Sequence, residues 1–193
     1  MEMKTTIQDY IYIQPNFFNT KFCNKVLKEV KTLNFTPNLF YNPNNDVSTD
    51  RSGETESLMS SELIPSNDLL LKQLWIGIKN YYTYINSPYF TRWQGFSQPR
   101  YNKYLAGKEM VFHADHVQSL FDGDRKGIPI LSVVGLLNNN FKGGNFILYN
   151  DSKEKILKLK AGDLLIFPSI FIYTHRVSAV TQGTRFSFAS WVW

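Results

Sequence analysis

Apolar residues in the first half of the chain recur with the period of an α-helix. Between Thr20 and Leu33 they fall three or four positions apart, and lysine and glutamate occupy the positions between them, which predicts a helix with one buried face. Asn19 or Thr20 can cap its first turn, and a second helix is predicted to begin near Ser66 or Asn67. The buried faces comprise Phe22, Val26, Leu27, Val30 and Leu33 in the first helix, and Leu70, Leu74, Ile78 and Tyr81 or Tyr82 in the second.

The segment between these helices has a different pattern. Residues 42–57, NPNNDVSTDRSGETES, are rich in turn formers and polar side chains and have almost no apolar periodicity. This composition predicts a mobile loop. Long loops in compact domains often cover an active site, but a plain solvated loop fits the pattern equally well.

From about residue 89 the apolar residues occur in short runs instead. Successive runs read YFTRWQ, PRYNKYL, MVFHADH, IPILSVVGLLN, GNFILY, KILKLK, DLLIFP, YTHRVSAV and TRFSFASWVW. They are rich in β-branched and aromatic residues, and GG at 143–144, AGD at 161–163 and QGT at 182–184 mark turns. Many strands separated by short turns predict an all-β barrel or sandwich with a helical layer on one side.

Length and composition are those of one globular domain. The chain has 193 residues, of which 43% are hydrophobic and 19% charged, which is enough for a buried core. We expect one domain over 1–193, with a helical layer and loop in 1–88 and a β core in 89–193. The net charge is +5, but the basic residues are scattered, which disfavours a nucleic-acid partner.

Cysteine content and hydropathy indicate the compartment. Cys23 is the sole cysteine, which excludes an intrachain disulfide and a cysteine-rich zinc site and suits a reducing environment. There is no basic segment followed by an apolar stretch at the N-terminus, and no apolar run approaches the roughly eighteen residues of a membrane span. We therefore expect a cytoplasmic protein without a membrane partner.

Two histidines and an aspartate carry the first chemical signal. In FHADH (112–116), His113 and Asp115 lie two apart, so on a strand both side chains share one face. His175 follows about sixty residues later, and two imidazoles with one carboxylate form the facial ligand set of non-haem iron(II) sites. A His-x-Asp pair alone more often makes a surface hydrogen bond. His116 has the opposite parity from His113, and we expect it to be a bystander.

A second signal lies in TRFSF (184–188). Arg185 and Ser187 alternate with two phenylalanines, so both can face the interior of a barrel. A buried guanidinium requires an anionic partner. Arg185 and Ser187 could together bind a ligand carboxylate, although a salt bridge to an earlier Asp or Glu would meet the same need.

Taken together, these motifs resemble those of the iron(II)- and 2-oxoglutarate-dependent oxygenases. The order is HxD, a histidine about sixty residues later, and Arg-x-Ser ten residues after that histidine. From about Gln98 to Trp193 the chain is most similar to the prolyl 4-hydroxylase branch, in the blocks RYNKYLAGKEMVFHADH, LSVVGLLNNNFKGGNFILY, LKLKAGDLLIFPS and HRVSAVTQGTRFSFASWVW. The resemblance implies a mainly β protein with supporting helices (α+β). Its core would be a double-stranded β-helix, a jelly-roll or cupin-like barrel, with the N-terminal helices packed on one sheet.

The resemblance also implies roles for particular residues. His113, Asp115 and His175 would hold iron(II), and Arg185 would bind the distal carboxylate of 2-oxoglutarate. Ser187 would assist Arg185, and Tyr104 would line the same pocket. Oxygen would be the third reactant, and ascorbate would serve as reductant.

Two positions depart from the branch. Collagen-type members usually have lysine where this chain has Arg185, which makes the chain more similar to bacterial and sensor-type members. Leu136 stands where some members have a second cosubstrate-binding tyrosine. Both departures leave iron and 2-oxoglutarate in place and weaken only the substrate assignment.

The implied substrate is a proline-containing peptide or protein, with a small molecule as the alternative. Trp93 and Trp191, together with Tyr89 and Phe90, could stack on a prolyl ring, although most aromatic residues of this chain must belong to the core. Arg51 lies in the polar segment where related chains have a substrate-side arginine. A solvated surface charge is an equal alternative for Arg51.

Three other functions compete with this interpretation. A cupin-like hydrolase or isomerase could hold zinc or manganese on the same ligands, but it would not need Arg185 and Ser187 to face inward. A non-enzymatic barrel that only binds a sugar or peptide would have no use for the complete ligand set. Nucleic-acid demethylases have a second arginine about six residues after the cosubstrate arginine, where this chain has Trp191.

Overall fold

The structure is a computed structural model that describes residues 6–42, 47–50, 57–87, 94–115, 129–150 and 153–193. The elements, in chain order, are η1 (Ile7–Tyr10), β1 (Tyr12–Gln14), α1 (Thr20–Val30), β2 (Thr36–Pro37), β3 (Leu39–Asn42), β4 (Val47–Asp50), β5 (Leu58–Ser60), α2 (Asn67–Ile85), β6 (Arg100–Tyr104), β7 (Met110–His113), β8 (Leu131–Leu136), β9 (Phe141–Gly143), β10 (Phe146–Asn150), β11 (Lys153–Leu157), β12 (Leu164–Pro168), η2 (Phe171–Tyr173), β13 (His175–Val177), β14 (Val180–Gly183) and β15 (Arg185–Val192). Strands dominate, as the sequence predicts.

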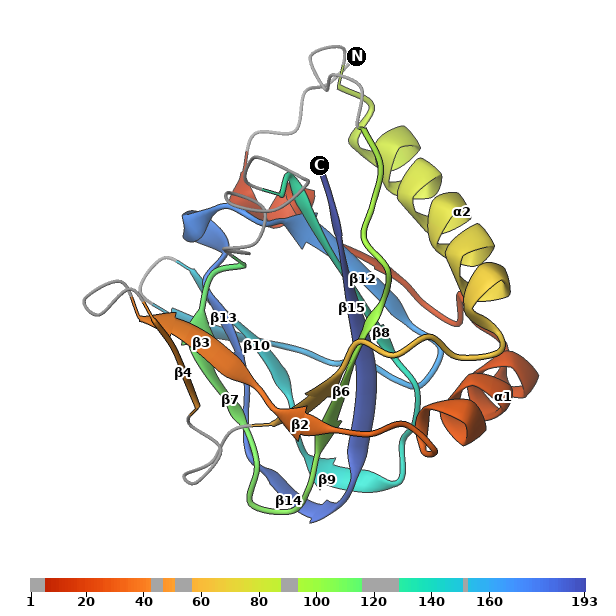
Figure 1. Ribbon diagram of the computed structural model, residues 1–193. Helices are drawn as coiled ribbons and strands as arrows, with labels where there is room; N and C mark the ends of the chain where they lie inside the picture. Colours follow the sequence, from red (N-terminus) through yellow and green to blue (C-terminus); the bar gives the residue numbers. More distant parts are fainter. Residues whose placement is uncertain (1–5, 43–46, 51–56, 88–93, 116–128, 151–152) are drawn as a thin grey trace.

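Two antiparallel sheets form the body of the molecule. The larger has seven strands in the order β1-β12-β8-β15-β6-β5-β2, and the smaller has four in the order β11-β10-β13-β7. Figure 1 shows the smaller sheet on one side of the larger one and both helices on the other. In the described part of the chain the two sheets are not closed into one hydrogen-bonded barrel, so the structure is an open double-sheet form of the predicted fold.

Both predicted helices begin where the sequence places them. The side chain of Asn19 accepts a hydrogen bond from the Phe22 amide at 2.9 Å and caps α1, as expected for an N-cap asparagine. Helix α2 begins at Asn67. Of the two candidate tyrosines, Tyr81 is buried, whereas Tyr82 is 47% exposed.

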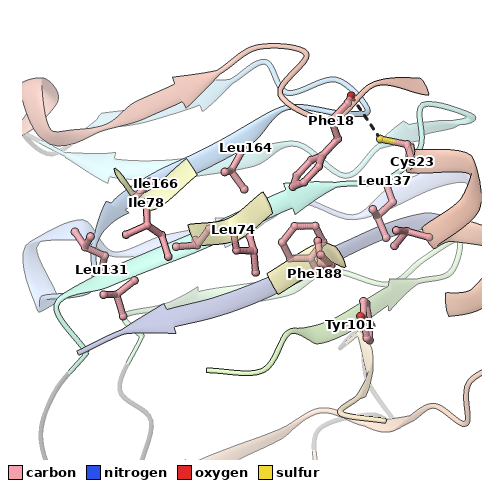
Figure 2. Packing of buried hydrophobic residues seen from close by; sticks show 14 of the residues in the cluster. Phe18, Cys23, Leu74, Ile78, Tyr101, Leu131, Leu137, Leu164, Ile166 and Phe188 are labelled. Atoms are coloured by element: carbon pink, nitrogen blue, oxygen red, sulfur yellow. Dashed lines mark hydrogen bonds between the residues drawn. The ribbon is translucent and has the colours of Figure 1, made fainter. Parts of the chain in front are cut away.

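The helices cover the outer face of the seven-stranded sheet. Leu74 and Ile78 of α2 pack in one cluster with Leu164 and Ile166 of β12, and Figure 2 shows these side chains together with Phe18 and Phe188. A Cβ atom at Gly77 would overlap the Leu164 side chain. Helix α2 can therefore approach the sheet closely only because this position has no side chain.

A second core lies between the two sheets. It comprises Tyr104, Val134, Leu165 and Phe167 from the larger sheet and Met110, Phe146, Leu148, Leu157 and Val177 from the smaller one, with Tyr173 from η2 and Val180 from β14. Because side chains alternate along a strand, the larger sheet contributes to both cores. No helix of the described residues is both long enough and apolar enough to cross a membrane.

Two local expectations need adjustment, and a third cannot be compared because its residues lie outside the described part of the chain. The segment 42–57, predicted as a loop, contains β4, which pairs with β3 from Leu39↔Asp50 to Asn42↔Val47. Pairing with β3 satisfies the backbone N–H and C=O groups of β4. A search for apolar periodicity does not detect a polar strand of this kind. The run 89–94 lies almost entirely outside the described residues, and β7 ends at His113, two residues before Asp115.

Candidate active site

The neighbouring strands β7 and β13 of the smaller sheet bring His113 and His175 together. The two residues are direct partners in the antiparallel ladder, and their ring centroids lie 4.3 Å apart. Oδ1 of Asp115 lies 3.5 Å from Nε2 of His113 and 3.8 Å from Nε2 of His175. In the part of the chain that the structure describes, no other group of three His, Cys, Asp or Glu side chains is spaced to hold a metal ion.

Backbone carbonyls orient both imidazole rings. Nδ1 of His113 lies 2.8 Å from the Val111 carbonyl oxygen, and Nδ1 of His175 lies 3.0 Å from that of Tyr173. An Nδ1–H that donates to a carbonyl leaves Nε2 with a lone pair, which is the arrangement typical of metal-binding histidines. Burial, together with His113, lowers the pKa of His175 to about 4, so this ring is neutral near pH 7.

Asp115 is held by a short hydrogen-bonded chain. The Ser132 hydroxyl donates to Asp115 Oδ2 at 2.5 Å, and the hydroxyls of Ser132 and Ser169 lie 2.8 Å apart. Burial alone would raise the pKa of Asp115, but the two histidines and Ser132 together lower it well below its usual range. The carboxylate is therefore ionised, with Oδ2 occupied by Ser132 and Oδ1 directed at the imidazoles.

These three side chains fit a divalent metal ion. Two imidazole nitrogens and one carboxylate oxygen form the donor set of the facial triad, and the same donors also suit zinc and manganese. The cluster borders a pocket, so a bound ion would keep positions open for ligands. The triad alone does not select iron.

The pocket has about 370 Å³ of empty space, part of it open to solvent. It is lined by Arg100, Asn102, Tyr104, Met110, His113, Asp115, Val134, Phe146, His175, Val177, Arg185, Ser187, Ala189 and Trp191. One wall is the ladder between β6 and β15, in which Tyr104, Asn102 and Arg100 stand opposite Arg185, Ser187 and Ala189. Phe186 and Phe188 belong to the core on the other face of the sheet, as the alternation predicts.

Arg185 is almost fully enclosed in this wall. It is 1% exposed, its Nη1 donates to the Ser187 hydroxyl at 2.7 Å, and its guanidinium lies 4.9 Å from the centre of the Tyr104 ring. Nε has no hydrogen-bond partner, and burial lowers the pKa of Arg185. No Asp or Glu of the described residues forms a salt bridge with it, so the alternative of an internal ion pair has no support there.

The remaining predicted site residues divide into two groups. Trp191 is 8% exposed and lines the pocket. Arg51, Trp93 and His116 lie outside the described residues, as do the aromatic residues at 89 and 90, and their roles stay predictions.

Sequence reasoning missed two polar residues of the pocket and one behind it. Arg100 and Asn102 have the same parity as Tyr104 on β6, so extending the alternation backwards from Tyr104 would have placed both in the pocket. Ser132 supports Asp115 from β8. Its signal was a small polar residue inside the otherwise apolar strand LSVVGL.

Comparison with known proteins identifies related sequences over the C-terminal half. Residues 99–193 match the profile of the 2OG-Fe(II) oxygenase superfamily. A PKHD-type hydroxylase of Idiomarina loihiensis is 35% identical over 91 residues, which cover 47% of this chain and 39% of that protein. A PKHD-type hydroxylase of Thermosynechococcus vestitus is 31% identical over 107 residues, or 51% and 46% of the two chains. The matches thus span less than half the length of these relatives.

Solved structures share the fold over nearly the whole chain. A Pseudomonas putida prolyl-4-hydroxylase superposes with a TM-score of 0.65 at 18% identity, covering 95% of this chain and 91% of that one. A Trichoplax adhaerens prolyl hydroxylase, solved with a hypoxia inducible factor peptide fragment, gives a TM-score of 0.72 at 19% identity, covering 96% and 84%. These similarities confirm the double-stranded β-helix fold.

Proposed function

Because residues 99–193 of this chain belong to the 2OG-Fe(II) oxygenase superfamily, we propose that the protein is an iron(II)- and 2-oxoglutarate-dependent dioxygenase that hydroxylates a C–H bond. His113, Asp115 and His175 would hold the iron, and Arg185 with Ser187 would bind the distal carboxylate of 2-oxoglutarate. One observation carries the proposal: a His-Asp-His cluster and a buried guanidinium without a carboxylate partner line the same pocket. A metal-dependent hydrolase would need only the first of these features.

The chain's own contribution is placement and exclusion of water. When bound, iron, 2-oxoglutarate and oxygen supply the oxidation, in which 2-oxoglutarate is converted to succinate and carbon dioxide. Val111 and Tyr173 carbonyls orient the imidazoles, and Ser132 orients Asp115. Tyr104 lies against the Arg185 guanidinium, and the apolar side chains between the sheets keep water from the reacting groups.

The proposed substrate is a prolyl residue of a peptide or protein. The relatives are PKHD-type hydroxylases, and one structure with the same fold is of a prolyl hydroxylase with a peptide fragment. Trp191 provides an aromatic surface in the pocket on which a prolyl ring could stack. We also propose ascorbate as reductant, a cytoplasmic location, and one domain over 1–193, because the two cores share the seven-stranded sheet.

Succinate release by the purified protein tests the proposal. Iron(II), ascorbate, oxygen and 2-oxoglutarate would be supplied with and without a proline-rich peptide. We expect succinate in both samples and more with the peptide. Peptide-independent turnover alone would support the oxygenase and leave its substrate open, whereas protein that holds iron and forms no succinate would contradict the proposal.

A further inference from the structure

Arg100 is a second cation in the pocket, partly buried, and the proposed reaction gives it no task. It lies at the start of β6, and its guanidinium lies 4.8 Å from the centre of the Trp191 ring. Its Nε is buried without a hydrogen-bond partner. The described residues place no carboxylate oxygen within 4.0 Å of it, although the side chain keeps part of its surface open.

The strand register places Arg100 far from Arg185. Arg185 stands opposite Tyr104, and Arg100 stands opposite Ala189, four residues further along the ladder. Four residues of a strand span about 13 Å. The Arg185 guanidinium lies over Tyr104, directly opposite it, whereas the Arg100 guanidinium lies over Trp191, further from Arg185 along β15. The pocket therefore has two separate cationic ends.

The metal ligands lie toward the Arg100 end. Trp191, which stacks on Arg100, is the ladder partner of Ser132 on β8, and Ser132 donates its hydrogen bond to Asp115. The Asp115 carboxylate is also close enough to influence the pKa of Arg100. A group held by Arg100 would thus be on the metal side of the pocket, where the substrate C–H bond must lie.

Charge balance leaves Arg100 without a counter-ion. The two charges of iron(II) and the charge of Arg185 balance Asp115 and the two carboxylates of 2-oxoglutarate. Asp115 is already committed to both histidines and to Ser132. Burying an arginine without an anion is costly, and a bidentate carboxylate is the partner that its planar fork fits best.

The pocket contains two further unpaired polar atoms, one beside Arg100 and one midway along the wall. Nε1 of Trp191 and Oδ1 of Asn102 are buried without hydrogen-bond partners. Each such atom carries a desolvation cost when it stays unpaired. Arginine and indole donors side by side are complementary to an acceptor such as a carboxylate.

We propose that Arg100, stacked on Trp191, binds a carboxylate of the oxidised substrate, so that the protein selects acidic substrates over neutral ones. This inference rests on the proposed oxygenase function and refines its substrate class. The carboxylate has two possible sources: the α-carboxylate of a free amino acid, or an acidic side chain next to the oxidised residue of a peptide.

Two matched ligand pairs distinguish these sources. The first pair is L-proline and L-prolinamide, and the second is an end-capped Glu-Pro-containing tetrapeptide and its Gln-Pro counterpart. Binding would be measured calorimetrically with manganese(II) and 2-oxoglutarate present, so that no turnover occurs. We expect at least one acidic probe to bind about ten- to a hundredfold more tightly than its amide, as for a charge-assisted contact.

Substitutions on β6 test whether Arg100 causes the preference for the acidic probes. Arg100→Gln should abolish the preference, and Arg100→Lys, which keeps the charge without the fork, should retain part of it. Lys103→Gln is the matched control, because Lys103 lies on the same strand, does not line the pocket and has its ammonium over the Phe35 ring. It should keep the full preference. Circular dichroism and manganese binding would verify that each variant is folded.

The outcomes separate this inference from the proposed function. Three results would each overturn the carboxylate subsite. They are equal binding of acid and amide in both pairs, no binding of either acidic probe at millimolar concentration, and a preference that survives in Arg100→Gln. Succinate release would be measured on the same preparations. A preference for the acidic probe without succinate release would support the subsite and refute the oxygenase function. Succinate release without a preference would support the oxygenase function and refute the subsite.

Discussion

Replacing Arg185 by methionine should weaken 2-oxoglutarate binding and at the same time stabilise the ligand-free protein. Arg185 is 1% exposed, with Ser187 as its hydrogen-bond partner and no carboxylate among the described residues. A bidentate contact to the distal carboxylate comprises two charge-assisted hydrogen bonds, together worth ~3 kcal/mol or more. We therefore expect at least about a hundredfold loss of 2-oxoglutarate affinity, while metal binding is retained.

The ligand-free protein should become more stable, although ligand binding becomes weaker, because Arg185 has no counter-ion when 2-oxoglutarate is absent. Without ligand, the guanidinium is desolvated and uncompensated, and replacing a poorly paired buried charge by an apolar side chain often stabilises by ~1–4 kcal/mol. The Ser187 hydroxyl would lose its partner, which costs ~1–3 kcal/mol. The difference between the central values of these two ranges is a gain of ~0.5 kcal/mol, or about 1–2 °C in Tm for a chain of this size.

Thermal unfolding with manganese(II), with and without 2-oxoglutarate, measures both effects. At a ligand concentration about a hundredfold above the wild-type Kd, 2-oxoglutarate should raise the wild-type Tm by about 5–10 °C. The same concentration should raise the Arg185→Met value by only about 1–2 °C. Lys103→Met on the neighbouring strand is the control and should respond like the wild type. If Arg185→Met is less stable without ligand and responds fully to 2-oxoglutarate, the assigned role of Arg185 is wrong.

Three other substitutions test the metal site and the scaffold. Asp115→Ala should abolish iron(II) binding in equilibrium dialysis, and retained stoichiometric iron would exclude Asp115 as a ligand. Ser132→Ala should weaken metal binding about 10- to 100-fold through loss of the carboxylate support; Ser178→Ala, outside the site, is its control, and equal affinities would refute that support. Gly77→Ala should destabilise the protein by ~1–3 kcal/mol in urea unfolding, because a Cβ atom at this position would overlap the Leu164 side chain, and unchanged stability would show that α2 can shift.

Local sequence patterns were enough to predict the two long helices, most of the strands, and the side chains of β15 that face the pocket. Helix α2 shows its buried face in Leu70, Leu74 and Ile78, because helical periodicity is a property of neighbouring residues. Strand β15 likewise separates Arg185 from Phe186 by alternation alone. The motif spacing pointed to His113, Asp115 and His175, and the structure brings these three together.

The other contacts of the site depend on how strands pair and how the two sheets pack, and the pattern of a single strand carries no information about either. Ser132 lies on β8 of the larger sheet and Asp115 follows β7 of the smaller one, so the two residues meet only through the packing of the two sheets. Arg100 meets Trp191 through the β6-β15 ladder, which joins residues about ninety positions apart. The β3-β4 pairing escaped prediction because β4 reads VSTD, which has no apolar alternation, so only its backbone pairing with β3 identifies it as a strand.

Isotope labelling of succinate is the most direct test of the central claim, because it needs no known substrate. Purified protein with iron(II), ascorbate and 2-oxoglutarate would be incubated under ¹⁸O₂, and the succinate analysed by mass spectrometry. A dioxygenase that decarboxylates 2-oxoglutarate with oxygen must place one labelled oxygen atom in succinate, and Asp115→Ala protein should form none. Unlabelled succinate, or none from iron-loaded wild-type protein, would contradict the account and favour a metal-dependent enzyme that does not use oxygen.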